Sequence, residues 1–308
     1  VPYSPETLLQ MGNQEWERAV SFETLEIVRN ASIPPPEMMK TVDVEIDQAR
    51  RDEIAIRVFL IRKNIFTIPE KMGHYTLRAT PEYLKALGSF GELDDFTAPD
   101  RRAENAVRYI PEPSPQLGFF YRTVAVDPRP LTVHEGVPGH YFQLLQAWQN
   151  PDFIRRHYFD SNANEGIGFY LEEMLLQEGL FDDRPHTREI IYRFMRLRAL
   201  RVAVDINLAL GKFSIAAAGD YLASTVPMDR QSAFSEAAFF AATPGQAISY
   251  QIGKLQILKL ISAARVKLGP DFGLKTYHDY MMVNGNVPIA LQHWEYLGAT
   301  DDIKKLWD

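Results

Sequence analysis

The chain has 308 residues, of which 46% are hydrophobic and 24% are charged, and its net charge is −7. This length and composition exclude an intrinsically disordered chain and are sufficient to form a substantial hydrophobic core. Because the sequence has no cysteine, no basic block and no apolar run of membrane-span length, we expect no disulfide, no thiolate metal ligand, no nucleic-acid partner and no membrane span.

The first third of the sequence has the pattern of two helices. Ser4 followed by Pro5 is typical of a helix start, and the apolar pattern that follows breaks at the proline-rich residues 32–36. A second long helix is expected over Glu37–Asn64. Many charges interrupt its apolar positions, which predicts that one of its faces is solvated.

The texture changes between Pro69 and Pro130, where three short segments favour β-strands. They are His74–Arg78, Ala106–Ile110 and Phe119–Val124, and prolines and glycines separate them. We expect them to form a small antiparallel sheet that ends just before the most informative segment of the sequence.

Helical patterns dominate again from Leu131 onward. Thr243 and Pro244 are a typical N-cap and first helical residue, and the helix that they open is expected to end near Gly269. Shorter helices are expected over Asp271–Val283 and Pro288–Leu297. The fold class is therefore mainly α, with a small antiparallel sheet before the segment that carries the chemistry, in a single domain over residues 1–308.

The segment His134-Glu135-Gly136-Val137-Pro138-Gly139-His140 combines two imidazoles with a carboxylate, a combination that suits zinc and a general base. Zinc peptidases commonly place the two histidines four residues apart on one helical face. Here they are six apart, which is about 600° of turn and roughly 9 Å of rise in a regular helix.

Regular helix therefore cannot direct both His134 and His140 at one ion. Pro138 and Gly139 offer a solution, because together they can break the helix and turn His140 back toward His134. On spacing alone, a metal site and an interrupted helix with two incidental histidines explain the segment equally well.

Glu165 is the candidate third ligand, since it follows His140 by enough residues for one helix, a turn and the start of the next. It shares a helical face with Phe169 and Glu172. The alternative is that Glu165 is a first-turn acid favoured by the helix dipole. For Glu172 and Glu173, the alternative to a role in the site is a place on a solvated helix face.

At these residues the chain resembles the bacterial family known as domain of unknown function 885, which is grouped with zinc-peptidase-like proteins. The matching motifs are HEGVPGHY at His134–Tyr141, EGIGFYLE at Glu165–Glu172, RALRVAVD at Arg198–Asp205, PGQAISYQIG at Pro244–Gly253 and YHDYMMVNGNVP at Tyr277–Pro288. They occur in the family's order and extend over most of the chain.

The chain departs from the family pattern at three positions, where Tyr141, Ile167 and Ala209 replace a histidine, a tryptophan and a histidine. Because only His140 of the family's His-His pair is kept, we expect His140 to be the second ligand. Family members are about twice as long, so the chain resembles their C-terminal half. We therefore expect it to self-associate, or to bind a missing N-terminal half, through exposed apolar surface.

The resemblance implies a helical zinc-peptidase-like domain in which His134, His140 and Glu165 hold Zn²⁺ and Glu135 is the general base. It also implies an oxyanion donor on a late helix, for which Tyr250 and His278 are the candidates. A buried, hydrogen-bonded tyrosine explains Tyr250 at least as well, and a structural role is favoured for His278.

The function expected is zinc-dependent hydrolysis of peptide bonds, with a peptide or small amide as substrate and a periplasmic or secreted location slightly favoured. A degenerate helical binding module and a hydrolase of non-peptide amides or esters are the alternatives. Arg198, Arg201 and Asp205 share one helical face, and a buried salt-bridge network is favoured for them over a role in binding substrate or orienting the site.

Overall fold

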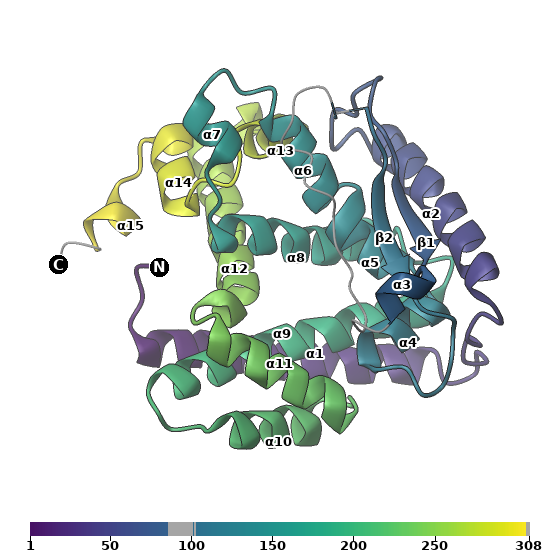
Figure 1. Ribbon diagram of the computed structural model, residues 1–308. Coiled ribbons are helices and arrows are strands. Elements are labelled where there is room, and N and C mark those ends of the chain that lie inside the picture. The colour runs from purple at the N-terminus through teal and green to yellow at the C-terminus, as the bar shows by residue number, and fades with distance from the viewer. Residues whose placement is uncertain (86–100, 102, 306–308) are drawn as a thin grey trace. The chain divides into compact units, whose positions relative to one another are not determined.

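The computed structural model describes residues 1–85, 101 and 103–305, and the described part of the chain is mainly α-helical, as predicted (Figure 1). No described helix is both long enough and apolar enough to cross a membrane. The elements are α1 (Pro5–Arg29), α2 (Val42–Lys63), β1 (Tyr75–Ala79), α3 (Glu82–Lys85), β2 (Ala106–Ile110), α4 (Phe119–Val126), α5 (Arg129–Leu131), η2 (Thr132–Gly136), α6 (His140–Ala147), α7 (Phe153–His157), α8 (Ser161–Gln177), α9 (Pro185–Ala209), α10 (Ile215–Thr225), α11 (Arg230–Ala242), α12 (Gln246–Leu268), η3 (Gly269–Asp271), α13 (Leu274–Val283), α14 (Ile289–Leu297) and α15 (Asp301–Lys304).

The chain divides into two compact units. The first consists of Val1–Pro36, Ser161–Leu260 and Pro288–Asp308, and the second of Glu37–Asp160 and Ile261–Val287. Each unit is therefore built from segments far apart in the sequence. The expectation of a single catalytic domain over residues 1–308 stays a prediction.

The first unit is organised around α1 and α9, which pack along each other (Figure 1). The helix α1 begins where the sequence predicts, since the Ser4 hydroxyl accepts a hydrogen bond from the Thr7 amide. Gly12 allows the close approach of the two helices, because a Cβ there would lie 2.8 Å from Cβ of Val202. Leu8, Val202, Ile206 and Ile252 form a hydrophobic cluster beside this contact.

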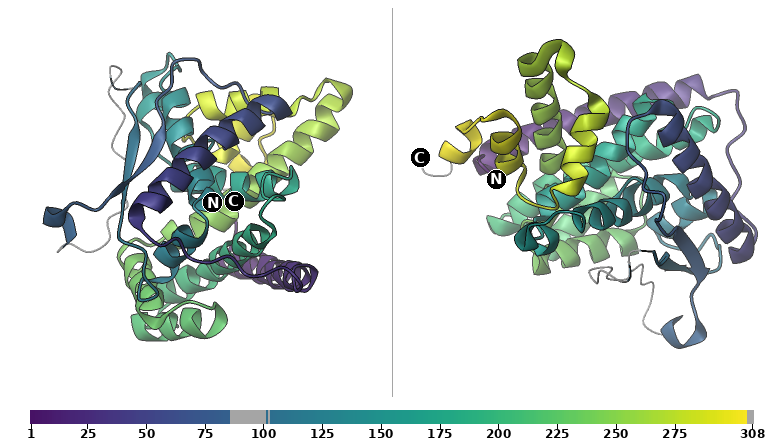
Figure 2. Two further views of the ribbon diagram at one scale, coloured as in Figure 1. Left: turned by 90° about the vertical axis from the view of Figure 1, so that its right-hand side faces the viewer. Right: turned by 90° about the horizontal axis from the view of Figure 1, so that it is seen from above.

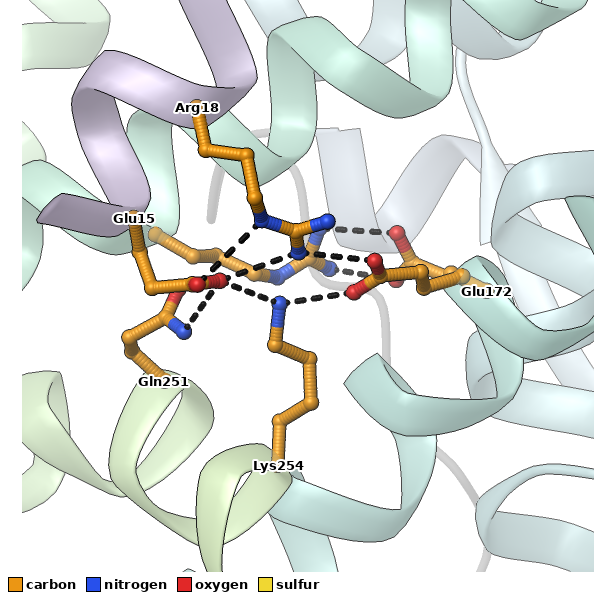
Figure 3. A network of polar contacts seen from close by, with 7 residues as sticks. Glu15, Arg18, Glu172, Gln251 and Lys254 are labelled. Atoms are coloured by element: carbon orange, nitrogen blue, oxygen red, sulfur yellow. Dashed lines mark hydrogen bonds and ion pairs between the residues drawn. The ribbon is translucent and has the colours of Figure 1, made fainter. Parts of the chain in front are cut away.

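A square of charges around the buried Lys254 joins α1, α8 and α12 of the first unit (Figure 3). Arg18 contacts Glu15 at 3.1 Å and Glu173 at 2.7 Å. Lys254, whose side chain is fully buried, contacts the same two carboxylates at 2.9 and 2.8 Å. Gln251 donates a further hydrogen bond to Glu15. Each charge in the square thus faces two charges of opposite sign.

The second unit contains the two-stranded sheet, with α2 packed against β1 (Figure 2). The strands pair in parallel, with Tyr75 opposite Ala106 and Ala79 opposite Ile110, so the predicted antiparallel arrangement is wrong. The residues between the two strands include α3 and are numerous enough for the crossover that parallel pairing requires.

The third predicted strand, Phe119–Val124, is also wrong, because these residues lie in α4. Gly118 is the N-cap, and Phe119, Val124 and Ala125 are the buried residues of the helix. A short aromatic and apolar run of this kind has no periodicity that distinguishes a buried strand from a buried helix.

Several helix ends differ by a few residues from those predicted. The second helix begins at Val42, because the Thr41 hydroxyl caps the Val44 amide, and not at Glu37. The helix expected from Pro244 begins at Gln246, and the one expected over Asp271–Val283 begins at Leu274. Prolines near these starts limit where the first turn can begin, but they do not fix a single residue.

Candidate metal centre

The segment that carries the two histidines is not regular helix. His134 and Glu135 lie in the wide π-helical turn η2, and Val137 is extended, with φ −123° and ψ 121°. The Val137–Pro138 peptide is cis, and a new helix, α6, starts at His140. The predicted break in the helix around Pro138 and Gly139 is therefore confirmed.

Gly139 is required for this break because its backbone packs directly on the preceding turn. A Cβ at position 139 would overlap the carbonyl oxygens of Val133 and His134 far inside van der Waals contact. No residue with a side chain fits there unless the turn moves. The glycine thus determines how closely α6 returns to η2.

The result is that the rings of His134 and His140 meet. Their centroids lie 4.7 Å apart with an interplanar angle of 78°, and both residues are buried. The neighbouring Tyr141 is occupied elsewhere, since its hydroxyl donates to the carbonyl of Glu104 at 2.7 Å. Of the two positions where the family has histidines, the structure therefore pairs His140 with His134.

Glu165 lies in the second turn of α8, which begins at Ser161. The explanation of Glu165 as a first-turn acid therefore does not hold. Its carboxylate accepts a hydrogen bond from Gln246 at 3.1 Å. His134, His140 and Glu165 could together hold a metal ion, because each offers one ligand atom and these atoms lie within 4.8 Å of one another.

The backbone next to Glu165 is held by a second close glycine contact. A Cβ at Gly166 would lie 2.6 Å from the Cα atom of Gly253, so α8 and α12 touch through their main chains at this point. This contact, together with the hydrogen bond from Gln246, determines where Glu165 lies relative to α12.

Glu135, the predicted general base, forms an ion pair within the second unit. Arg108 of β2 donates to it from Nη1 at 3.1 Å, and the Glu135 side chain is 22% exposed. The ring of Tyr75 packs on the residue that follows, since a Cβ at Gly136 would lie 2.7 Å from Cγ of Tyr75. The two strands thus hold the Glu135–Gly136 segment from one side.

Tyr75 and Arg108 influence each other electrostatically. Burial raises the pKa of the Tyr75 hydroxyl, and the positive charge of Arg108 offsets only part of this effect. Burial alone would lower the pKa of Arg108, but Tyr75 and Glu135 raise it overall. Tyr75 is therefore a neutral hydroxyl and Arg108 a cation at any physiological pH.

Tyr250 lies in the first unit between two arginines. The guanidinium carbon of Arg201 is 4.6 Å from the centre of its ring and that of Arg198 is 5.7 Å away. Burial raises the pKa of Tyr250, and the carboxylate of Glu165 raises it further. The tyrosine is thus a neutral donor close to a predicted metal ligand.

The arginines themselves belong to a buried network, as the sequence analysis favoured. Arg198 pairs with Glu172 at 2.8 Å, and Arg201 pairs with Glu236. Asp205 accepts from the amides of Gly245 and Ile248 and so caps the start of α12.

Because Glu172 is fully buried and the Glu173 side chain is 13% exposed, the idea that these two acids form a solvated face is wrong. Their positive partners, which lie on other helices, replace the solvent that an isolated carboxylate needs.

His278 occupies a fully buried position on α13. Its Nδ1 atom lies 2.8 Å from the carbonyl oxygen of Ile65, and its ring stacks on Phe66 with a centroid distance of 4.3 Å. The next residue, Asp279, accepts from the amide and hydroxyl of Thr67. Both residues therefore tie α13 to the segment after α2, and a catalytic role for His278 stays a prediction.

Arg108 and Tyr75 have no role predicted from the sequence beyond their place in strands. One signal was available, since Arg108 alternates with Ala106 and Ile110 and so lies on the face of β2 whose other residues are buried. A charged residue on a buried face needs a partner, but the sequence does not say that the partner is Glu135.

The two remaining departures from the family pattern are accommodated differently. Ile167 is fully buried in α8 and contributes to the core. Ala209 is the last residue of α9 and is exposed. Neither change alters a candidate metal ligand.

Comparison with known proteins supports the resemblance seen in the motifs. The model of the family described as "Bacterial protein of unknown function (DUF885)" matches residues 37–292. No curated protein matches the chain significantly.

Two solved structures share the fold. A "putative lipoprotein" from Colwellia psychrerythraea superposes with a TM-score of 0.82 at 20% sequence identity, over 97% of this chain and 53% of the other. A "putative lipoprotein of unknown function" from Shewanella oneidensis superposes with a TM-score of 0.76 at 18% identity, over 96% and 57%. The chain thus spans little more than half the length of these proteins.

Proposed function

The chain belongs to the DUF885 family, whose function is unknown, and we propose that it is a zinc-dependent hydrolase that acts on peptide bonds. The observation that carries the proposal is the contact between the buried rings of His134 and His140, six residues apart in sequence. A π-helical turn, an extended residue and a glycine without room for a side chain combine to make that contact. An incidental pair of histidines would not need such a backbone.

The donor set fits zinc. Two imidazoles and one carboxylate, here His134, His140 and Glu165, are the ligands of one common type of catalytic zinc site, which keeps a position open for water or substrate. When bound, the ion would polarise a carbonyl group and lower the pKa of a water molecule. The sequence has no cysteine, so a thiolate-rich structural site is excluded.

The residues around the proposed ligands have the chemistry that hydrolysis needs. Glu135 would accept a proton from the attacking water and pass it to the leaving amine. Its ion pair with Arg108 restricts the orientation of the carboxylate. Tyr250, a neutral hydroxyl near Glu165, would donate to the developing oxyanion. The complete burial of His278 favours Tyr250 over His278 for that role.

Peptides are the substrate class we propose, and small amides or esters are the alternative that the same chemistry allows. An extracytoplasmic location follows by analogy with the two solved structures described as lipoproteins. A binding module that has lost catalysis is the competing function, and metal content separates it from the enzyme.

The test is the metal content and peptidase activity of the purified chain and its variants, measured by mass spectrometry and with a peptide library. We expect one zinc per chain. His134→Ala, His140→Ala and Glu165→Ala should each lose the metal. Glu135→Gln should keep it and lose hydrolysis, since an amide cannot accept the proton.

His157→Ala is the matched control, because His157 is an exposed histidine on α7 of the second unit, and it should keep both metal and activity. A metal-free chain with an intact fold would favour the binding module. Loss of zinc from Glu135→Gln would make Glu135 a ligand and contradict the assignment of roles.

A further inference from the structure

Arg108 has more hydrogen-bonding capacity than its ion pair with Glu135 uses. Its Nη1 atom donates to Glu135, whereas its Nε atom is buried and has no hydrogen-bond partner among the described residues. A guanidinium carries five N–H donors in a plane, and an unused donor away from water costs free energy. A buried, unused arginine donor next to the proposed catalytic base therefore points to a ligand that accepts hydrogen bonds.

The hydroxyl of Tyr75 is a second unused donor beside the first. Within the described part of the chain it has no hydrogen-bond partner of good geometry, although Tyr75 is almost fully buried. The parallel register sets Tyr75 opposite Ala106, two residues before Arg108, so both side chains leave the same face of the sheet. The two groups are neighbours, and a weak hydrogen bond from the Arg108 guanidinium to the Tyr75 oxygen leaves the O–H of Tyr75 as a donor.

These donors lie next to the proposed catalytic base. Arg108 contacts Glu135, which follows His134 in the chain, and the ring of Tyr75 packs on Gly136. The Arg108 side chain keeps 19% of its surface exposed, so a ligand can approach its solvent-facing part, and a small movement of the side chains would then present the buried Nε and the Tyr75 hydroxyl. A substrate held by these donors would have its acceptor oxygens close to Glu135, and therefore close to the bond that is cleaved.

A carboxylate is the acceptor that fits best. Its two oxygens match the planar fork of a guanidinium, and a neutral hydroxyl can add a third hydrogen bond. A peptide carbonyl would use only one of the donors and would leave the others unsatisfied. Arg108 has one carboxylate partner among the described residues, whereas each arginine and lysine of the square in the first unit has two.

We propose that Arg108 and Tyr75 bind the free C-terminal carboxylate of the peptide substrate, so that the enzyme removes residues from C-terminal ends. This inference rests on the proposed function and narrows its substrate class from peptides in general to peptides with an unblocked C-terminus.

The experiment compares two peptides of one sequence, one with a free C-terminal carboxylate and one amidated, as substrates of the full zinc-loaded chain. The wild-type chain should cleave the free acid about 10- to 100-fold more efficiently in kcat/KM, as expected for charge-assisted hydrogen bonds. Arg108→Met should abolish the preference, because kcat/KM should fall by that factor more on the free acid than on the amide, whatever loss both peptides share through the missing ion pair with Glu135. Tyr75→Phe keeps the ring and should lose about 3- to 10-fold.

Arg78→Met is the matched control, because Arg78 is an exposed arginine on the neighbouring strand β1. It should keep the full preference for the free acid. Circular dichroism and thermal unfolding of each variant verify that the fold is retained.

Three outcomes would overturn the inference. Equal cleavage of both peptides by the wild-type chain would indicate an endopeptidase, and the proposed function would stand. An equal loss on both peptides in Arg108→Met would make Arg108 a residue that only positions Glu135. If neither peptide is cleaved, calorimetric binding of the same two peptides replaces turnover, and equal affinities would contradict the inference. Metal content separately reports whether the zinc site itself exists.

Discussion

Two clusters of charged residues, one in each unit of the chain, differ in how far their hydrogen bonds are completed. In the first unit, Glu15, Arg18, Glu173 and Lys254 form a closed square in which every charge has two partners (Figure 3). In the second unit, Arg108 has one carboxylate partner, and its own Nε and the hydroxyl of Tyr75 have no hydrogen-bond partner of good geometry among the described residues. The first arrangement is complete without a ligand, and the second is not.

The difference separates a structural role from a binding role. A closed network joins helices and adds nothing to recognition, because its hydrogen bonds are already made. An open cluster is less stable alone and gains hydrogen bonds when a ligand arrives. Whether the partners of a buried cation are complete is thus a better guide to function than its charge alone, and the following predictions test that distinction in order of expected effect.

Breaking the closed square should have the largest effect on stability. Lys254→Met removes a fully buried cation and leaves Glu15 and Glu173 with one cationic partner fewer, which should cost about 3 kcal/mol. Lys259→Met on the same helix is the control. Its side chain is 43% exposed and pairs with Asp302, so it should cost less than about 1 kcal/mol. Urea unfolding of both variants measures the difference.

Glu45 of the second unit is a buried carboxylate that faces another acid. Burial raises its pKa from 4.5 to about 7, and the neighbouring Glu112 adds to this effect. The folded protein therefore binds this proton more tightly than the unfolded chain. Its contribution to stability is complete below about pH 4.5 and is lost as pH rises through about 7, by up to about 3 kcal/mol.

Glu45→Gln should remove this part of the pH dependence, because glutamine does not titrate. Thermal unfolding between pH 4.5 and pH 8 checks it. A wild-type protein whose stability is no lower at pH 8 than at pH 4.5, relative to Glu45→Gln, would contradict the prediction.

Removing the ion pair between Arg108 and Glu135 should cost much less stability than removing Lys254 from the square. Arg108→Met leaves Glu135 without its ion pair, but Glu135 keeps 22% of its side chain exposed to water, so we expect a loss of less than about 2 kcal/mol. The comparison with Lys254→Met in one urea series tests this directly. A larger loss from Arg108→Met would mean that Arg108 mainly stabilises the fold.

The smallest effects on stability are expected on the surface, where each unit has a row of exposed apolar residues. Phe22, Leu25 and Val28 form one along α1, and Ile54, Val58 and Ile61 form another along α2. Such rows favour self-association, and sedimentation at several concentrations should detect it. Val58→Glu should weaken association and change stability by less than about 0.5 kcal/mol. A wild-type chain that stays monomeric at all concentrations would contradict the prediction.

The sequence predicts the helical fold and the break in the helix between His134 and His140 because both follow from local constraints. Serine and threonine caps define helix starts, and a six-residue spacing with Pro138 and Gly139 has few solutions if both histidines are to meet. The predicted break is confirmed because it rests on what a backbone can do at two neighbouring residues.

The partners of Glu135 and Glu172 could not be predicted, because they depend on contacts across the chain. Arg108 is 27 residues from Glu135, and Arg198 is 26 residues from Glu172. A helix pattern places an acid on one face but does not say whether water or an arginine covers it. The parallel pairing of β1 and β2 was missed for the same reason, since the register depends on residues far apart in sequence.

The contact between Gly166 and Gly253 limits how this sequence can vary. At most positions in a protein interior, a larger side chain on one helix can be offset by a smaller one on its neighbour. Here neither helix can offer that compensation, because each glycine already faces main-chain atoms of the other helix and nothing smaller exists. A mutational library at these two positions should therefore return the parental pair of glycines. The residue that follows Glu165 in the chain is thus expected to tolerate no substitution, even where the surrounding sequence varies.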